Sequence, residues 1–402
     1  MVDFLPFQGL VPELTAGEHI AERISPPYDV IGEEERRRLQ SNHHNVTRIT
    51  LGAKEGKYDE AAKELATWIK EGSLRRTKKA CYYLYRQSFE FRGERRTRTG
   101  IMGRLKLESY GKGNIMPHEE TFPKIKEDRL NLLRATSAHL ESIFGIYDEM
   151  DLGTRDLLLN IKEAFHFVDA SGVSHSFCII REKKVIMQLN ALFAAKQVLI
   201  ADGHHRYETA LQYSQENPQD KEKGFVLATL VGSDDPGLLV EPTHRLLQDI
   251  GMPVDQFMTA IVKDFGIWEM RSAAELATAM ERSKRVMLGA LLPDGRIFAL
   301  EHLEAPDDNP LWSVDTFVCE ELVVKPILSA LPPDKPARIE YDHDLGSVRK
   351  KMETGTYAIA IVLSPPKLET IWEMARSGKK MPKKSTYFYP KVWSGFVIMP
   401  MP

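Results

Sequence analysis

Apolar and polar positions in the first third of the chain recur with two different spacings. Residues 58–76 carry apolar side chains at about every third or fourth position, which predicts an amphipathic helix. Residues 81–91 and 99–107 alternate loosely between apolar and polar, and the charged turn between them indicates paired strands. A polar loop rich in Gly and Pro occupies 111–126, and we expect a helix from about Asp128 to Tyr147.

The middle of the chain contains the sharpest pattern. The apolar run Val198–Ala201 predicts a buried strand, and a helix is expected directly after it, from about Arg206 to Gln215. A second apolar strand is expected at 224–231. From Gly251 onward the pattern predicts helices at 254–265 and 273–284, a hairpin at 286–303, an apolar helix at 312–331, a helix at 346–353, a strand at 358–363 and a helix at 368–377.

This mixture of strands and helices predicts an α/β fold of the mixed α+β kind. A chain of 402 residues is long enough for two or three domains. The change of pattern places a boundary near residue 250. We therefore expect one domain in residues 1–250 and a C-terminal α/β domain in residues 251–402.

Composition narrows the classes of function. A net charge of −3 gives no general reason to expect nucleic-acid binding. No stretch approaches the roughly 20 apolar residues of a membrane span, and the first residues lack the pattern of a signal peptide. Cys81, Cys178 and Cys319 match no metal or redox spacing and suggest a reducing compartment. We therefore expect a cytoplasmic protein that binds neither nucleic acid nor membrane.

The turn after the strand at 198–201 concentrates reactive groups. Residues 202–206, with the sequence DGHHR, place a carboxylate, two imidazoles and a guanidinium at a helix N-terminus, whose N–H groups attract anions. Arg206 offers a planar fork to a phosphate. Asp202 offers oxygen ligands to a divalent cation, or a proton acceptor. His204 and Glu208 are four residues apart and share a helix face. A purely structural turn does not need this set of groups.

Two further clusters resemble anion sites by residue type. Thr243, His244 and Arg245 follow an apolar strand, and the alternative for them is an ordinary polar strand end. Residues 383–387, with the sequence KKSTY, combine two ammonium groups with hydroxyls before an aromatic run. They do not form a P-loop, because the glycines of that motif are absent. The alternative for this second cluster is a solvated basic loop.

Two unusual polar loops add candidates for acid–base chemistry and substrate contact. Tyr28 and Asp29 lie in the loop PPYDV, and His118 and Glu119 lie in the loop MPHEETFPK. Asp29 and Glu119 are candidate proton acceptors, whereas Tyr28 and His118 are candidate substrate-binding residues.

A nitrogen-rich metal site is the alternative interpretation of the histidines. His204, His205 and His244 could join Asp202 around a transition metal. Neighbouring side chains on a helix diverge by about 100°, so His204 and His205 cannot both face one ion easily. The sequence therefore favours the phosphate interpretation over the metal one.

In this order and combination the motifs resemble those of the bacterial and archaeal domain of unknown function 1015 family, over essentially the whole chain. The matching stretches are PPYDVI (26–31), PHEETF (117–122), ADGHHRYETAL (201–211), PTHRLL (242–247) and MPKKSTYFYPK (381–391). The DGHHR turn is also similar to the signature turn of the ParB/sulfiredoxin fold, to which free-serine kinases belong. The resemblance implies a ParB/sulfiredoxin-like core in 1–250 with an insertion at about 53–190, and a C-terminal domain that closes the site through residues 381–391.

The residues indicate a small-molecule phosphotransferase, and the resemblance implies that its acceptor is the hydroxyl group of free L-serine. The donor would be pyrophosphate, ADP or ATP, with Mg²⁺ held by Asp202. Phosphate contacts are expected from Gly203, Arg206, Thr243, His244, Arg245, Lys384, Ser385 and Thr386. The candidates for acid–base chemistry are Asp202, His204, His205, Glu119 and Asp29, and the sequence leaves the choice open. The alternatives are a metal-dependent phosphatase and a non-catalytic nucleotide- or nucleic-acid-binding protein.

Overall fold

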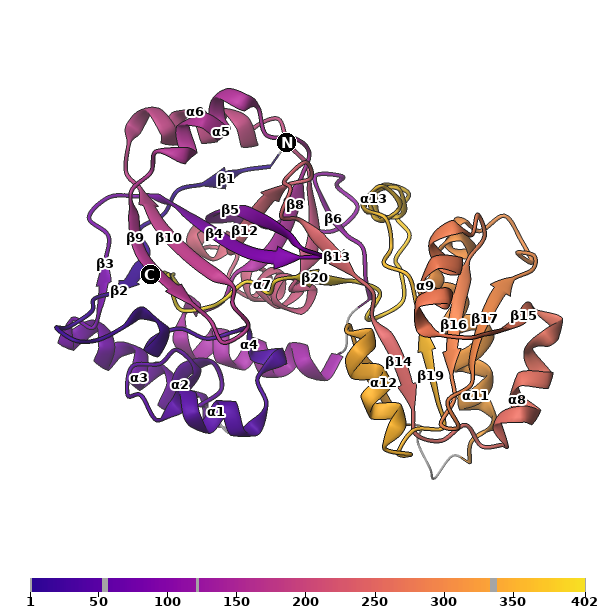
Figure 1. The fold of residues 1–402 in the computed structure, drawn as a ribbon. Coiled ribbons are helices and arrows are strands. Elements are labelled where there is room, and N and C mark those ends of the chain that lie inside the picture. The colour runs from indigo at the N-terminus through magenta and orange to yellow at the C-terminus, as the bar shows by residue number, and fades with distance from the viewer. Residues whose placement is uncertain (1, 53–56, 121–122, 333–337, 402) are drawn as a thin grey trace. The chain divides into compact units, whose positions relative to one another are not determined.

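The computed structural model describes residues 2–52, 57–120, 123–332 and 338–401, and it contains two compact units (Figure 1). Unit 1 consists of Met1–Pro117, Thr121–Leu239 and Pro390–Pro402, and unit 2 consists of His118–Glu120 and Val240–Tyr389. The chain thus leaves unit 1 and returns to it for its last residues. Residue 250, where the sequence predicts a boundary, lies inside unit 2, before α8 (Val254–Ala260).

Unit 1 is built on a mixed sheet of nine strands. Its strands are β1 (Phe4–Leu5), β4 (Tyr82–Phe91), β5 (Glu94–Lys106), β6 (Ile115–Pro117), β8 (Ile143–Tyr147), β9 (Glu163–Val168), β10 (Ser174–Ile180), β11 (Val198–Asp202) and β12 (Phe225–Gly232). The strand order is β6-β11-β8-β12-β5-β4-β10-β9, and β1 pairs with β5. β11 is parallel to β6 and β12 is parallel to β8, whereas β11 and β8 are antiparallel. β11 therefore lies near one edge of the sheet, and β9 and β10 form the other.

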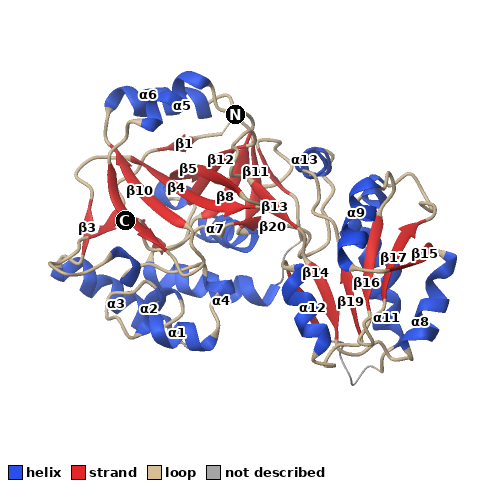
Figure 2. Ribbon diagram, in the orientation of Figure 1, coloured by secondary structure: helices blue, strands red, loops and turns tan. Residues whose placement is uncertain are grey.

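Helices cover this sheet on both sides (Figure 2). They are α1 (Glu33–Gln40), α2 (Thr47–Thr50), α3 (Tyr58–Glu71), α4 (Pro123–Thr136), α5 (Leu152–Leu159), α6 (Lys183–Phe193) and α7 (His204–Glu216). Two small sheets complete the unit, β2 (Leu10–Pro12) with β3 (Leu74–Arg76), and β7 (Ala138–His139) with β21 (Met399–Pro400). The helix predicted at 58–76 is confirmed as α3, although its last predicted residues form β3.

The β4–β5 hairpin confirms the strand pair predicted from residues 81–107. Phe91 pairs with Glu94, and the two residues between them, Arg92 and Gly93, have φ values of 51° and 79°. A two-residue turn with positive φ at both positions matches the twist of a hairpin. Leu84 pairs with Ile101, and both are fully buried in the core of unit 1. Local pattern and turn chemistry thus agree here.

The helix predicted over residues 128–147 is wrong in its second half. α4 ends at Thr136, Ser137 adopts a left-handed conformation (φ 45°), and the chain continues into β7 and β8. The β8 sequence, IFGIY, is rich in β-branched and aromatic residues that favour strands. A Cβ on Gly145 would lie 2.7 Å from Leu230 and 2.8 Å from Val198. Close packing against strands remote in sequence therefore decides this segment.

Unit 2 is built on a sheet of six strands. They are β14 (His244–Leu247), β15 (Phe265–Met270), β16 (Met287–Leu291), β17 (Ile297–His302), β18 (Ile339–Asp342) and β19 (Ile359–Val362). The order is β15-β17-β16-β19-β14-β18, and every pair is antiparallel. The helices are α8, α9 (Ala273–Arg282), α10 (Asp315–Cys319), α11 (Lys325–Ala330), α12 (Leu345–Glu353) and α13 (Leu368–Arg376). Two short strands, β13 (Leu239–Glu241) and β20 (Tyr387–Tyr389), pair with each other.

The predicted hairpin at 286–303 is confirmed as β16 and β17. The helix predicted at 312–331 is present from Asp315, with a π-helical stretch, Glu320–Val324, between α10 and α11. The helix predicted at 254–265 is shorter, because β15 begins at Phe265 and pairs with β17. Among the described helices, none combines the length and the apolar character that crossing a membrane requires. The observed architecture is the mixed α/β fold that the sequence predicts.

Candidate functional site

The DGHHR turn has the predicted strand–turn–helix conformation. β11 is apolar and buried up to Ala201, and α7 begins at His204. Gly203 between them has a φ of 87°, a conformation that disfavours any residue with a Cβ. A Cβ at this position would also lie 3.0 Å from Nε and Nη2 of Arg206. Gly203 thus lets the guanidinium fold back over the turn, at the N-terminus of α7.

Asp202 lies between two cations. Its Oδ2 accepts a hydrogen bond of 2.6 Å from Nζ of Lys391, and its Oδ1 lies 3.5 Å from Nη2 of Arg206. The side chain of Asp202 is 24% exposed, and those of Lys391 and Arg206 are each 15% exposed. Burial alone would raise the pKa of Asp202, but Lys391 and Arg206 outweigh it and hold that pKa well below its usual range. Asp202 is therefore a carboxylate at neutral pH.

Arg206 is held from its other side as well. Its Nη1 donates a hydrogen bond to the carbonyl oxygen of Ser142. Burial alone would lower the pKa of Arg206, but Glu141 and Asp202 outweigh it and raise the pKa. Glu141 is 8% exposed, and the sequence did not single it out. The guanidinium is thus a fixed positive charge beside the start of α7, which suits the binding of an anion.

Lys391 reaches Asp202 because the chain segment that carries it is anchored to the sheet. Arg98 on β5 donates a hydrogen bond to the carbonyl oxygen of Pro390. Gln87 on β4 donates one of 2.8 Å to the carbonyl oxygen of Lys391. Burial lowers the pKa of Arg98 to about 10, so this side chain is still a cation at neutral pH. Two buried polar side chains of the β4–β5 hairpin therefore position the last segment of unit 1.

The PPYDV loop lies close to the same turn. Tyr28 begins a short 3-10 helix, Tyr28–Val30, and its backbone N–H donates to Oε1 of Glu141 at 3.3 Å. The guanidinium of Arg129 lies over the Tyr28 ring, 4.4 Å from its centroid. Burial raises the pKa of Tyr28 to about 12, so the phenol is neutral. Asp29 is exposed and its charge acts on Arg206. The structure thus brings Tyr28 and Asp29 into the neighbourhood of Asp202 and Arg206.

The two histidines of the turn have different environments. His204 is buried, at 6% exposure, and His205 is half-buried. Glu208, the predicted partner of His204, forms an ion pair of 2.9 Å with Lys126. His205 is therefore the more accessible of the two for proton transfer to a bound molecule.

The remaining predicted site residues belong to unit 2, where they form a cluster of their own. The backbone N–H of Lys384 donates to Oε1 of Glu119 at 2.7 Å, and Nε2 of His118 lies 3.0 Å from Oγ1 of Thr386. The backbone N–H of Met381 donates to the carbonyl oxygen of His118 at 2.8 Å. The described part of the PHEETF motif, residues 117–120, therefore contacts the MPKKST motif. Thr121 and Phe122 lie outside the described residues.

Several predicted phosphate ligands in this cluster are engaged in structural contacts. Arg245 is 1% exposed, and it donates to the carbonyl oxygens of Thr243 and, at 3.0 Å, of Lys384. Ser385 is fully buried and donates to the carbonyl oxygen of Pro382 at 2.6 Å. Burial lowers the pKa of His244 to about 4, so this imidazole carries no charge at neutral pH. Arg245 and Ser385 thus hold the KKST loop, whereas the side chain of Lys384 is exposed.

Asp202 does not fit the role of a resident metal ligand. Both of its oxygens face fixed cations, and a divalent ion there would meet the charges of Lys391 and Arg206. Among the described residues, no group of three or more His, Cys, Asp or Glu side chains is placed to hold a metal. Mg²⁺ stays a prediction, as an ion that phosphate groups of a donor would bring with them.

Sequence reasoning missed three residues that shape the site in unit 1. Lys391 is the last residue of the MPKKSTYFYPK motif, so its place in that motif was the available signal. Glu141 and Arg98 lie outside every motif, Glu141 in a stretch predicted as helix and Arg98 in the charged turn predicted between the strands at 81–91 and 99–107. Their roles depend on contacts with segments that are far apart in the sequence.

Comparison with known proteins gives likenesses at low identity. None of the curated proteins matches the chain. A mutant free serine kinase in complex with AMP is 13% identical, with a TM-score of 0.40, over 68% of this chain and 84% of its own. A conserved hypothetical protein from Pyrococcus furiosus is 14% identical, with a TM-score of 0.38, over 69% of this chain and 89% of its own. At these TM-scores the likeness carries no conclusion about this chain.

The sequence itself gives a clearer result. The profile of the family described as "Protein of unknown function (DUF1015)" matches residues 4–318, which is more than half of the chain. The matched region includes four of the five motifs on which the family resemblance was based. The chain therefore belongs to the DUF1015 family.

Proposed function

We propose that the protein is a small-molecule phosphotransferase that phosphorylates the hydroxyl group of free L-serine. The observation that supports the proposal is the fixed group of charges formed by Asp202, Arg206 and Lys391 at the N-terminus of α7. Transfer of a phosphoryl group requires positioned cations around the migrating phosphate and a base near the acceptor hydroxyl.

Each part of the turn has a role in this proposal. The guanidinium of Arg206 and the first backbone N–H groups of α7 bind the oxygens of the donor phosphate. α7 has no side-chain cap at Gly203, so no side-chain oxygen of that residue competes for these N–H groups. Lys391 adds a second cation 2.6 Å from Asp202. The carboxylate of Asp202 contacts both cations and holds them in place for the phosphate.

In the reaction, the hydroxyl oxygen of serine forms a bond to the terminal phosphorus of a phosphoanhydride. The bond from that phosphorus to the bridging oxygen breaks, and the remaining phosphate or nucleotide leaves with the electron pair. The hydroxyl proton passes to a base, for which His205 and Asp29 are the accessible candidates in unit 1. Pyrophosphate is the first donor to test, followed by ADP and ATP. Mg²⁺ enters as a companion of the donor.

The test is a screen of donors with and without L-serine, followed by ³¹P NMR. We expect a resonance of O-phosphoserine only when donor, Mg²⁺ and serine are all present. Asp202→Asn keeps the shape of the side chain and removes its charge, so it should abolish the product. Lys106→Met removes an exposed lysine paired with Asp3 at 3.0 Å, and it serves as the control. Hydrolysis of the donor in the absence of serine would favour a phosphatase. The absence of turnover with every donor would reject the proposal that the protein is a phosphotransferase.

A further inference from the structure

A cavity of unit 1 lies at the edge of the sheet opposite to β11. Its volume is about 850 Å³, within the range of pockets that hold small ligands. Its walls come from β2, β3 and the loop after β3, from β9 and β10, and from the start of α6. It contains none of the residues assigned to the proposed phosphotransferase site. We call it the edge pocket.

The edge pocket has a strongly positive rim. Six exposed cations line it, against a single carboxylate, Glu13. The cations are Arg75, Arg76, Lys78, Lys79, Arg181 and Lys183. Glu13 lies 3.7 Å from Arg75, and within the described part of the chain the other five cations form no ion pair. Like charges gathered around one cavity repel each other, so an anion in the pocket would be attracted by all of them.

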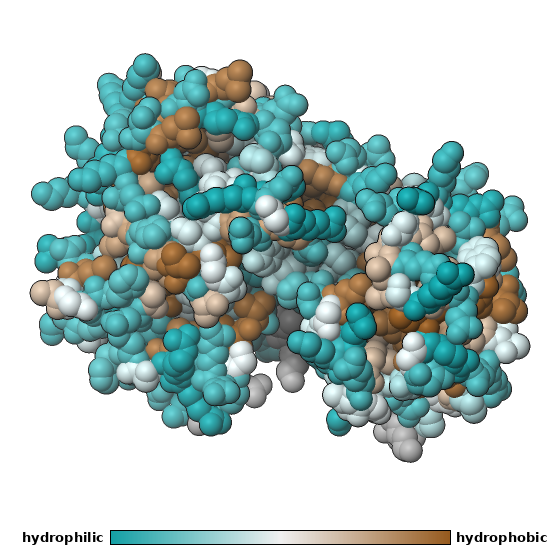
Figure 3. Space-filling view, in the orientation of Figure 1, coloured by the Kyte–Doolittle hydropathy of each residue, from teal (hydrophilic) through white to brown (hydrophobic). Residues whose placement is uncertain are grey.

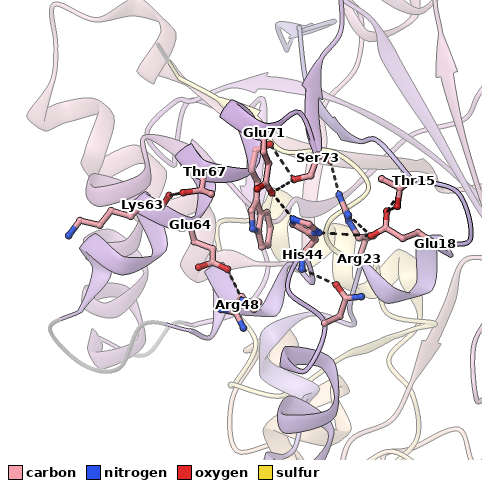
Figure 4. Close-up of polar contacts among 12 residues, drawn as sticks. Thr15, Glu18, Arg23, His44, Arg48, Lys63, Glu64, Thr67, Glu71 and Ser73 are labelled. Carbon is pink, nitrogen blue, oxygen red and sulfur yellow. Dashed lines mark hydrogen bonds and ion pairs between the residues drawn. The ribbon is translucent and has the colours of Figure 1, made fainter.

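Two arginines elsewhere in the same part of unit 1 pair with carboxylates (Figure 4). Arg23 lies 2.9 Å from Glu18, and Arg48 lies 2.6 Å from Glu64. Arg23 also donates to the carbonyl oxygen of Ser73, directly before β3. Five of the six rim cations lack such a carboxylate partner among the described residues.

The start of α6 adds to the positive potential. Lys183 and Lys184 occupy its first turn, which has no acidic residue, although cations are unfavourable at the positive end of a helix. The neighbouring carboxylate of Glu182 accepts a hydrogen bond of 3.0 Å from the backbone N–H of Arg181. Lys183 lines the pocket, whereas Lys184 does not.

The floor of the edge pocket is apolar. Val11, Phe165, Ile179 and Ile186 line it, and Phe165 stacks on Phe177 of the core. Met187 at its margin is 61% exposed. In the space-filling view, apolar surface lies over α5 and α6 among hydrophilic side chains (Figure 3). Exposed apolar area next to concentrated positive charge is typical of a binding surface, because neither feature stabilises the free protein.

We propose that the edge pocket binds a small amphipathic anion, which has an apolar tail and a phosphate head group. The tail would lie on the floor formed by Phe165, Ile179 and Ile186. The head group would contact the lysines and arginines of the rim. A neutral apolar ligand would leave the cations of the rim without a partner. A bare inorganic anion would leave the apolar floor uncovered. The proposal is independent of the proposed function of the other site.

Isothermal titration calorimetry with octyl phosphate, below its micelle concentration, tests the proposal. We expect one molecule to bind per chain. Inorganic phosphate and octyl glucoside each carry only one of the two features, and both should bind the edge pocket at least about tenfold more weakly. Arg206→Lys should leave the affinity for octyl phosphate unchanged, which separates this pocket from the phosphotransferase site.

Two sets of variants locate the binding. Replacing Lys78, Lys79 and Lys183 by Gln should weaken the binding of octyl phosphate about tenfold, because half of the rim cations lose their charge. Met187→Ser should lower the affinity for octyl phosphate and leave the affinity for inorganic phosphate unchanged. A matched set of exposed lysines outside the pocket, Lys63→Gln with Lys70→Gln and Lys112→Gln, should leave the affinity for octyl phosphate unchanged. Binding that the control set weakens as much as the rim set would overturn the proposal, as would the absence of binding or equal affinity for inorganic phosphate.

Discussion

Nζ of Lys391 lies 2.6 Å from Oδ2 of Asp202, although 189 residues separate them in the sequence. The contact joins the last residue of β11 to the last residue of the final motif. It also places an ammonium group beside a carboxylate that is already paired with Arg206. The three side chains form a charged group whose members depend on one another, because each is largely removed from water.

The first prediction concerns this ion pair. Lys391→Met should lower the free energy of unfolding by about 2 kcal/mol, because Asp202 would lose its closest cation while remaining mostly buried. The pKa of Asp202 should rise from its lowered value, which carboxyl NMR can follow. Lys106→Met breaks an exposed pair of similar length and should have little effect. Equal effects of the two substitutions on stability would show that Lys391 does not stabilise Asp202.

The second prediction concerns the fork of Arg206. Arg206→Lys should fold, because a helix tolerates lysine well. If the proposed reaction holds, it should raise the KM for the phosphate donor by about tenfold or more, because an ammonium group lacks the planar fork with which Arg206 contacts Asp202, Ser142 and a phosphate in a fixed geometry. Arg134→Lys, on the exposed face of α4, is the control for a general effect of the exchange. An unchanged KM for every donor would remove Arg206 from the phosphate site.

The third prediction concerns pH. His139 is 7% exposed, its Nε2 lies 2.9 Å from the carbonyl oxygen of Phe225, and burial lowers its pKa to about 4. Between that value and the ordinary pKa of about 6.5, the unfolded chain binds a proton that the folded chain does not. Stability should therefore fall as pH falls from about 6.5 to 4, by up to about 3 kcal/mol from this group.

The measurement is hydrogen exchange of the β12 amides as a function of pH. His139→Gln keeps a donor for the Phe225 carbonyl and removes the titration, so it should flatten this part of the profile. A variant whose β12 amides keep the full dependence on pH would assign the effect to another group.

The fourth prediction concerns the backbone of Lys384, which has a φ of 60°. An L-residue in this conformation is strained by about 1 kcal/mol, and glycine is not. Lys384→Gly should therefore be at least as stable as Lys384→Ala, which reverses the usual order of these two residues. Lys383, which has no positive φ, should show the usual order with alanine more stable. Thermal unfolding of the four variants makes the comparison, and the usual order at both positions would contradict the strained conformation.

Elements whose signals are local were predicted well from the sequence. The β4–β5 hairpin and the β11–α7 turn depend on neighbouring residues, such as Gly203, whose positive φ the turn requires. β8 was predicted as helix, because the packing of Gly145 against Val198 and Leu230 cannot be read from its own residues. β15 was missed for a similar reason, since its partner β17 lies further along the chain.

The candidate site follows the same rule. Asp202 and Arg206 could be identified, because their residue types at a helix start indicate anion chemistry on their own. Arg245 has the same residue type at a strand end, yet it is 1% exposed and holds the KKST loop. The two arginines differ in their role because they differ in burial, and burial depends on the whole fold. Glu141 and Lys391 could not be placed, because each acts through contacts with distant segments.

The return of the chain to unit 1 has a consequence for synthesis in the cell. Ribosomes make Asp202 and Arg206 long before Lys391, since all of Val240–Tyr389 is translated in between. In a nascent chain, Asp202 therefore has Arg206 but not Lys391 as a partner. Strand β7 also lacks its partner, because β21 has not yet been translated. A premature stop or trimming before residue 390 would remove the ammonium group together with that strand. Quality control that acts on unfinished chains would meet unit 1 in this incomplete state.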